Sequence, residues 1–87
     1  MDISPDVKEK ISAAKAALTK HVEFMPGILN VFSSILVTAI MEGWYPNQGL
    51  LSQIFATVDQ EDIQLAVVAL EAVLEERKIV LAQPKTA

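Results

Sequence analysis

The chain has 87 residues, a formal net charge of −4, no cysteine and 52% hydrophobic residues. This length suits a single domain, and the large apolar fraction excludes a disordered acidic tail. The absence of cysteine excludes disulfides, thiolate metal sites and thiol catalysis.

A first helix is predicted over residues 5–22. Ser4 is a suitable N-cap, Pro5 fits the first helical position, and Asp6 suits the positive end of the helix dipole. Apolar residues then recur at helical spacing in one narrow stripe, formed by Val7, Ile11, Ala14, Leu18, Val22 and Met25. We therefore expect an amphipathic helix that buries one side.

A second helix is predicted over residues 26–42, and it contains most of a stretch without formal charge that runs from Phe24 to Met41. Gly43 is placed to end this helix, since glycine readily adopts the left-handed conformation of a C-cap. One broad half of the helix is apolar and holds Ile28, Leu29, Val31, Phe32, Ile35, Leu36, Ala39 and Ile40. Polar residues fill most of the other half, namely Asn30, Ser33, Ser34 and Thr38. Val37 and Met41 also fall in that polar half.

The uncharged stretch 24–41 has an alternative interpretation as a single membrane span. Its length is borderline for a span, and Trp44 and Tyr45 just beyond it resemble an interfacial aromatic pair. The Pro26–Gly27 break, the polar stripe and the acidic residues at both ends argue against insertion. A half-buried helix is the better interpretation.

Two further helices are predicted over residues 47–57 and 60–77. The shorter one would turn Leu50, Leu51, Ile54 and Phe55 toward the core. Asp59 is placed to cap the longer one, with Glu61 and Asp62 in its first turn in the manner of a capping box. Arg77 and Lys78 suit its C-terminal end, and residues 79–82 either continue it or form a short strand.

Together these elements predict the all-α class, as a small orthogonal or up-down bundle of about four helices. The bundle is expected to form one domain over residues 1–83, with a frayed tail at 84–87 after Pro84.

The helix predicted over residues 60–77 is apolar on two sides. Its main stripe consists of Ile63, Val67, Leu70 and Leu74, widened by Ala66 and Val73. On the opposite side lie Leu65, Val68 and Ala72, at spacings of three and four residues. A helix with two apolar faces is either central in its own domain or shared with another chain, and the pattern leaves both open.

The order of elements over residues 26–82 is similar to that of winged-helix domains. In that fold the helix is followed by a short apolar strand, and here the run LEERKIVLA would supply it. The helix that would correspond to a recognition helix carries acidic residues, namely Glu61, Asp62, Glu71, Glu75 and Glu76. The resemblance therefore implies a transcription-associated protein that binds other proteins rather than DNA.

The sequence contains no pattern typical of a catalytic, metal or cofactor site. His21 is the single histidine, and its nearest acid, Glu23, is not at a metal-ligand spacing. We expect a boundary histidine that is hydrogen-bonded or solvated. Ser33 and Ser34 lie in mid-helix without a nucleophile elbow, so we expect no enzyme, no metal and no cofactor.

Charge placement argues against nucleic-acid binding. Lysine and arginine occur only up to Lys20 and again from Arg77, so every formal charge at residues 22–76 is negative. Nucleic-acid binding needs clustered cations. The N-terminus MDISPDVKEK lacks a basic region followed directly by an apolar run, so we expect a cytoplasmic protein without a signal peptide.

The sequence is therefore interpreted as a non-enzymatic protein–protein interaction module, such as a small acidic adaptor, chaperone or inhibitor. It would dock an apolar helix face on a protein partner or on a second copy of itself. Leu65, Val68 and Ala72 are the first candidates for this contact, with Val37, Met41, Trp44 and Tyr45 as further ones. For the adjacent aromatics, an anchor in an interface and a plug at the end of the bundle remain alternatives.

Overall fold

A computed structural model describes residues 3–82, with side chains as far as Ile79, and these residues form helices joined by turns. The helices are α1 (Pro5–Thr19), α2 (Ile28–Glu42), α3 (Gln48–Ile54) and α4 (Gln60–Ala82). The predicted all-α class is thereby confirmed. The predicted tail at 84–87 lies outside the described residues.

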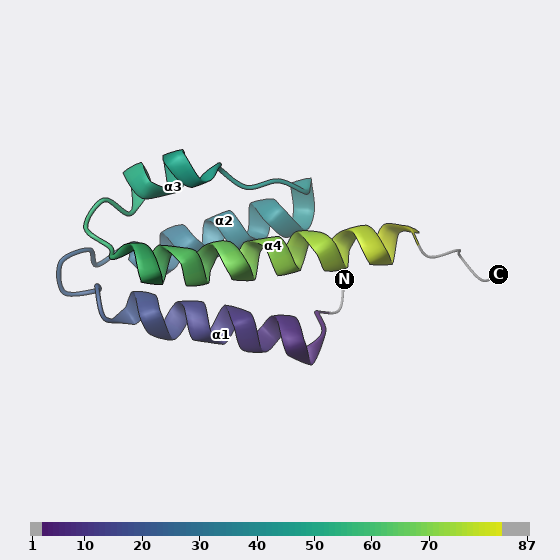
Figure 1. Ribbon diagram of the computed structural model, residues 1–87, viewed down its shortest axis with the longest axis horizontal. Coiled ribbons are helices and arrows are strands. Elements are labelled where there is room, and N and C mark those ends of the chain that lie inside the picture. The colour runs from purple at the N-terminus through teal and green to yellow at the C-terminus, as the bar shows by residue number, and fades with distance from the viewer. Residues whose placement is uncertain (1–2, 83–87) are drawn as a thin grey trace.

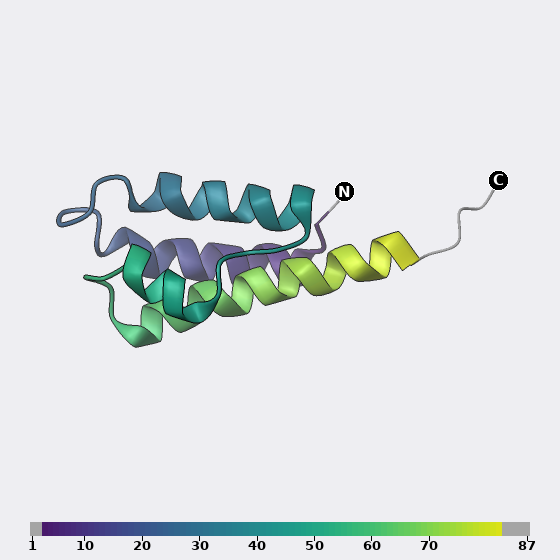
Figure 2. The same cartoon turned by 90° about the horizontal axis from the view of Figure 1, so that it is seen from above.

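The helices form an up-down rather than an orthogonal bundle. Figure 1 shows α1 running in one direction and α2 and α4 in the other, with the short α3 inside the connection that returns from α2 to α4. The longest helix, α4, packs against each of the other three. It lies between α3 above and α1 below, and Figure 2 places α2 and α4 at opposite edges of the bundle.

The first helix begins as predicted but ends earlier. The Ser4 hydroxyl oxygen accepts a hydrogen bond from the N–H of Val7 at 3.3 Å, and Pro5 occupies the first turn. After Thr19 the N–H groups of His21 and Val22 bond back three residues, to the carbonyls of Leu18 and Thr19. The predicted end at residue 22 is therefore wrong, because the chain tightens into successive turns before Pro26.

The second helix ends at the predicted glycine. Gly43 has a φ of +78°, in the left-handed region, and its N–H donates to the carbonyl of Ala39. The side chain of Arg77 on α4 crosses this end, where its Nε donates to the Ile40 carbonyl at 3.0 Å. A cation at the negative end of the α2 dipole is favourable. The positive charge of Arg77 therefore lies at the C-terminus of α2 and not at the C-terminus of its own helix, α4.

The third helix is shorter than the predicted range 47–57. The Asn47 side chain caps it by accepting from the N–H of Leu50 at 2.9 Å. It ends at Ile54, and the following turns carry Phe55 and Val58 into the core together with Leu51. Leu50 is exposed, so its predicted place in the core is wrong.

The fourth helix continues past the predicted end at residue 77 as far as Ala82. The strand considered for residues 79–82 is wrong, because this segment continues the helix. The winged-helix resemblance depended on that strand and loses its support with it. Figures 1 and 2 show the last turns of α4 projecting beyond the ends of α1 and α2.

The core lies between α4 and its three neighbours. Its largest fully buried side chains are Phe32, Phe55, Leu18, Ile28, Leu51, Ile63, Leu70 and Val73. Both α1 and α4 also bury alanines, which allow two helix backbones to approach closely. Throughout residues 3–82, no helix has both the length and the apolar content that crossing a membrane requires.

Gly43 provides a test of how α4 holds the end of α2. A Cβ added there would lie 2.6 Å from the Nη1 of Arg77, at a backbone conformation that L-residues rarely adopt. We expect Gly43→Ala to lower the free energy of unfolding by about 1–3 kcal/mol, measured by urea denaturation followed by circular dichroism. Gly27→Ala is the matched control, since its Cβ would meet nothing within 4 Å. Equal stability of both variants would contradict the arrangement.

Candidate protein-interaction surface

The fourth helix presents an apolar line to solvent on the side away from the core. Leu65 is 40% exposed and Val68 37% exposed, although Ile63, Leu70 and Val73 on the inner side are fully buried. Ala72 is partly exposed on the same line, four residues beyond Val68. In Figure 1 this free side of α4 lies between α3 and α1, with α2 behind it.

The same line extends to Ile79, which the sequence interpretation missed. Ile79 is 53% exposed and follows Ala72 by seven residues, a spacing that returns to the same side of a helix. It was overlooked because the helix was predicted to end at residue 77. The repeat of Leu65, Ala72 and Ile79 every seven residues is the signal that could have revealed it. We call Leu65, Val68, Ala72 and Ile79 the outer seam.

A cleft of about 350 Å³ adjoins the C-terminal half of the outer seam, between α4 and the start of α1. It is lined by Ser4, Asp6, Val7, Lys10, Ala72, Glu75, Glu76 and Ile79. Glu76 Oε1 accepts a hydrogen bond from the N–H of Ser4 at 2.8 Å, at the positive end of the α1 dipole. Its other oxygen, Oε2, is buried and has no hydrogen-bond partner among the described residues.

The further candidates on α2 belong to a different surface. Val37 and Met41 are both exposed, as their place in the polar half of that helix predicts. The buried side of α2 faces the bundle, so these residues lie on its outer side, and Figure 2 shows α2 and α4 at opposite edges. The structure therefore does not bring Val37 and Met41 together with the outer seam.

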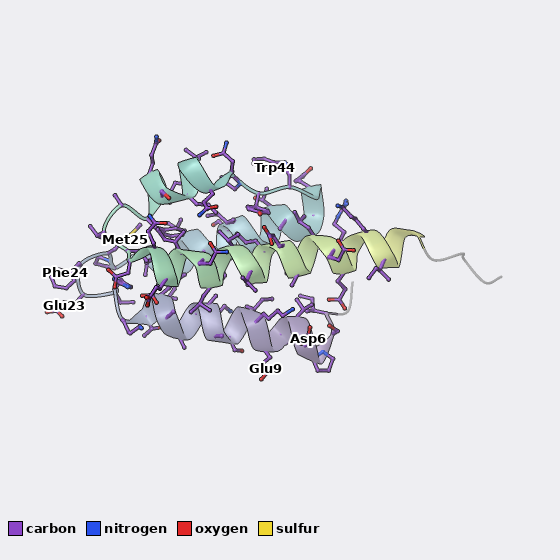
Figure 3. All side chains as sticks on the ribbon, viewed as in Figure 1. Asp6, Glu9, Glu23, Phe24, Met25 and Trp44 are labelled. Atoms are coloured by element: carbon purple, nitrogen blue, oxygen red, sulfur yellow. The ribbon has the colours of Figure 1, made fainter. Side chains whose placement is uncertain are left out.

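The two adjacent aromatic residues have different surroundings. Trp44 is exposed on the connection after α2, where Figure 3 labels it on the α3 side of the bundle. Tyr45 packs against the core, and its hydroxyl donates to Glu71 Oε1 on α4 at 3.4 Å. Burial, and next the negative charge and hydrogen bond of Glu71, raise the pKa of Tyr45 above its ordinary value of 10.0. Tyr45 thus joins the connection to α4, whereas Trp44 lies exposed to solvent.

The turn between α1 and α2 also exposes a large apolar side chain. Phe24 is 77% exposed, and Figure 3 shows it beside Glu23 at the tip of this turn, at the end of the bundle away from the cleft. A single exposed aromatic residue at a turn is common in soluble proteins and does not define a site.

The single histidine joins the end of α1 to the start of α4. The Nε2–H of His21 donates to Asp62 Oδ2 at 2.7 Å, and Lys20 Nζ lies 3.6 Å from the other oxygen of the same carboxylate. Asp62 is buried, and each of its two carboxylate oxygens has one of these partners. Burying a carboxylate without partners would cost free energy. The predicted boundary histidine is hydrogen-bonded. Its partner is 41 residues away in sequence, where no local pattern could reveal it.

The same corner contains residues that could hold a metal ion. His21, Asp59 and Asp62 offer ligand atoms within 4.8 Å of one another, and a histidine with two carboxylates is a ligand set that suits zinc. A zinc ion bound by His21 and Asp62 Oδ2 would have to replace the hydrogen bond between these two side chains. That hydrogen bond accounts for the closeness of His21 and Asp62.

Comparisons with protein-family models, with curated proteins and with solved structures found no match to this chain.

Tyr45 can be titrated directly because it is the only tyrosine of the chain. We expect its tyrosinate absorbance to appear with a midpoint above pH 10.0, and Glu71→Gln to lower that midpoint. Because the pKa is raised in the folded state, the contribution of the neutral phenol to stability is present below pH 10.0 and is lost as the pH rises through the folded-state pKa. Glu75→Gln removes the same charge elsewhere on α4 and should leave the midpoint unchanged. Equal effects of the two substitutions would contradict the contact.

The contact between His21 and Asp62 should contribute to stability. We expect His21→Ala and Asp62→Ala each to lower the free energy of unfolding by about 1–3 kcal/mol, since each leaves the other side chain of the pair without its partner. The double variant should cost less than the sum of the two single variants. Lys20→Ala serves as the control and should cost less than about 1 kcal/mol, because the Lys20 side chain is 68% exposed. Additive single effects, or no effect, would contradict the coupling.

Proposed function

We propose that this chain is a non-enzymatic protein–protein interaction module, a small acidic adaptor, chaperone or inhibitor that acts in the cytoplasm. The observation that carries the proposal is the outer seam of α4. Leu65, Val68 and Ile79 place apolar surface in solvent along a helix whose other side is the core of the bundle.

The packing of α4 against the other helices favours a role of the outer seam in binding. α4 is packed by all three other helices, so its backbone is already ordered before any partner arrives. Binding to an ordered helix avoids the conformational entropy that ordering a flexible segment would cost. An apolar line with helical spacing is suited to the helix-docking mode of recognition, in which side chains at i, i+3, i+4 and i+7 make the contact.

The charges near the seam weigh against the nucleic-acid alternative. Glu61 precedes Leu65 by four residues and Glu75 follows Ala72 by three, so both acids lie on the same side of α4 as the seam. A phosphate backbone would be repelled there. The chain's one histidine lies in another part of the bundle, where it is hydrogen-bonded to Asp62.

Two charged substitutions in the seam test the proposal. Leu65→Lys and Val68→Glu should abolish association with the partner, or self-association, and leave helicity intact, because both side chains lie on the free side of α4. The measurements are the solution mass, the circular dichroism spectrum and capture of partners from the native host. If both variants keep the wild-type mass and bind partners normally, the outer seam is not the interface.

Exposed apolar residues elsewhere provide the matched controls. Leu50→Lys makes the same chemical change at an exposed leucine of α3 and should leave association unchanged. Val37→Glu is the counterpart of Val68→Glu on the opposite edge of the bundle. Loss of association with Val37→Glu alone would move the interface to α2.

A further inference from the structure

The exposed charged residues beside the outer seam are acidic. Glu61 and Glu75 are exposed on the seam side, and Asp6 and Glu76 line the adjoining cleft. The cation of the cleft, Lys10, is already paired with Asp6 at 3.3 Å. On α4, Arg77 is engaged by the Ile40 carbonyl, and Lys78 follows Glu71 by seven residues, which places it on the flank of α4 and not on the seam.

This charge pattern favours a cationic partner over a second copy. Another copy would bring the same Glu61 and Glu75 and the same net charge of −4 toward the seam. Like charges brought together beside an apolar contact oppose association, and complementary ones favour it. A partner with lysine or arginine beside its apolar residues would instead place positive charges next to Glu61 and Glu75.

The cleft provides a second, separate reason. The cleft is lined by the acids Asp6, Glu75 and Glu76, against the one cation Lys10. The cleft opens beside Ala72 and Ile79, so a long side chain from a helix lying along the seam can enter it next to Glu75 and Glu76. An ammonium or guanidinium group placed there would be attracted by these carboxylates.

We infer that the partner of the outer seam is a cationic amphipathic helix, which sets its apolar side on Leu65, Val68, Ala72 and Ile79 and inserts a lysine or arginine into the cleft. This inference rests on the proposed function and names the chemistry of the partner at the same surface. Leu65 and Ile79 are separated by about 21 Å of helix, so the partner needs about four helical turns to cover the seam.

The experiment uses designed peptides in place of the unidentified partner. One fluorescent peptide of about 18 residues carries leucines at heptad positions a and d and lysines at e and g, and a second has glutamates in place of those lysines. By fluorescence anisotropy the full chain should bind the lysine peptide at least about tenfold tighter than the glutamate peptide. This preference should weaken as salt is added.

Variants separate binding at the seam from general attraction to an acidic protein. Glu75→Gln should weaken binding of the lysine peptide several-fold. Glu42→Gln removes the same charge from an exposed position on α2 and should leave this binding unchanged. Leu65→Lys should abolish binding, and Leu50→Lys, with the same change of charge, should not. Equal effects within either pair, or no binding of the lysine peptide, would overturn the inference.

Two outcomes distinguish this inference from the proposed function. If both peptides bind equally and Leu65→Lys abolishes both, the seam is an interface and the preference for cations is wrong. If the wild-type chain sediments as a dimer that Leu65→Lys dissociates, the partner is a second copy, which overturns the cationic helix and leaves the proposed function in place.

Discussion

The polar contacts that α4 makes with the ends of its neighbours hold the bundle in register. Glu76 meets the N-terminus of α1 through the Ser4 N–H, and the next residue, Arg77, meets the C-terminus of α2 through the Ile40 carbonyl. Helix ends carry unpaired backbone groups and partial charges, so an anion at one and a cation at the other are both favourable. At the opposite end of the bundle, Asp62 binds His21 just after α1. The helix α4 therefore contacts α1 near both of its ends and α2 at its C-terminal end.

This arrangement assigns different roles to the two sides of α4. The inner side supplies core residues and, at its edges, the side chains that bind the helix ends. In the outer seam only Ala72 packs partly against the core, and the exposed apolar surface of Leu65, Val68 and Ile79 contributes no burial to the stability of the isolated chain. Glu61 and Glu75 beside the seam would repel the same residues of a second copy, which opposes pairing of two seams.

Local signals were enough to predict where each helix begins to within two residues, the end of α2, its core half, and the exposure of Val37 and Met41. Contacts between distant segments could not be predicted in the same way. Asp62 fits the first turn of a helix and Arg77 the last, so each already had a local explanation. The structure gives both residues distant partners, His21 in the turn after α1 and the Ile40 carbonyl on α2, which are 41 and 37 residues away in sequence. The early end assigned to α4 followed from the local interpretation of Arg77, and it removed Ile79 from the predicted surface.

The packing of α1 on α4 determines how a partner can bind. Both helices bury small residues, namely Ala14 and Ala17 on α1 and Ala66 and Ala69 on α4. Because these side chains are small and closely packed, there is little room for a side chain of another protein to take their place. An incoming helix that displaced α1 would also have to break the contacts of Ser4 and His21 with α4. Addition to the outer seam breaks none of these contacts. A partner is therefore expected to bind on the outside of the intact bundle, where the cleft beside α1 is already formed.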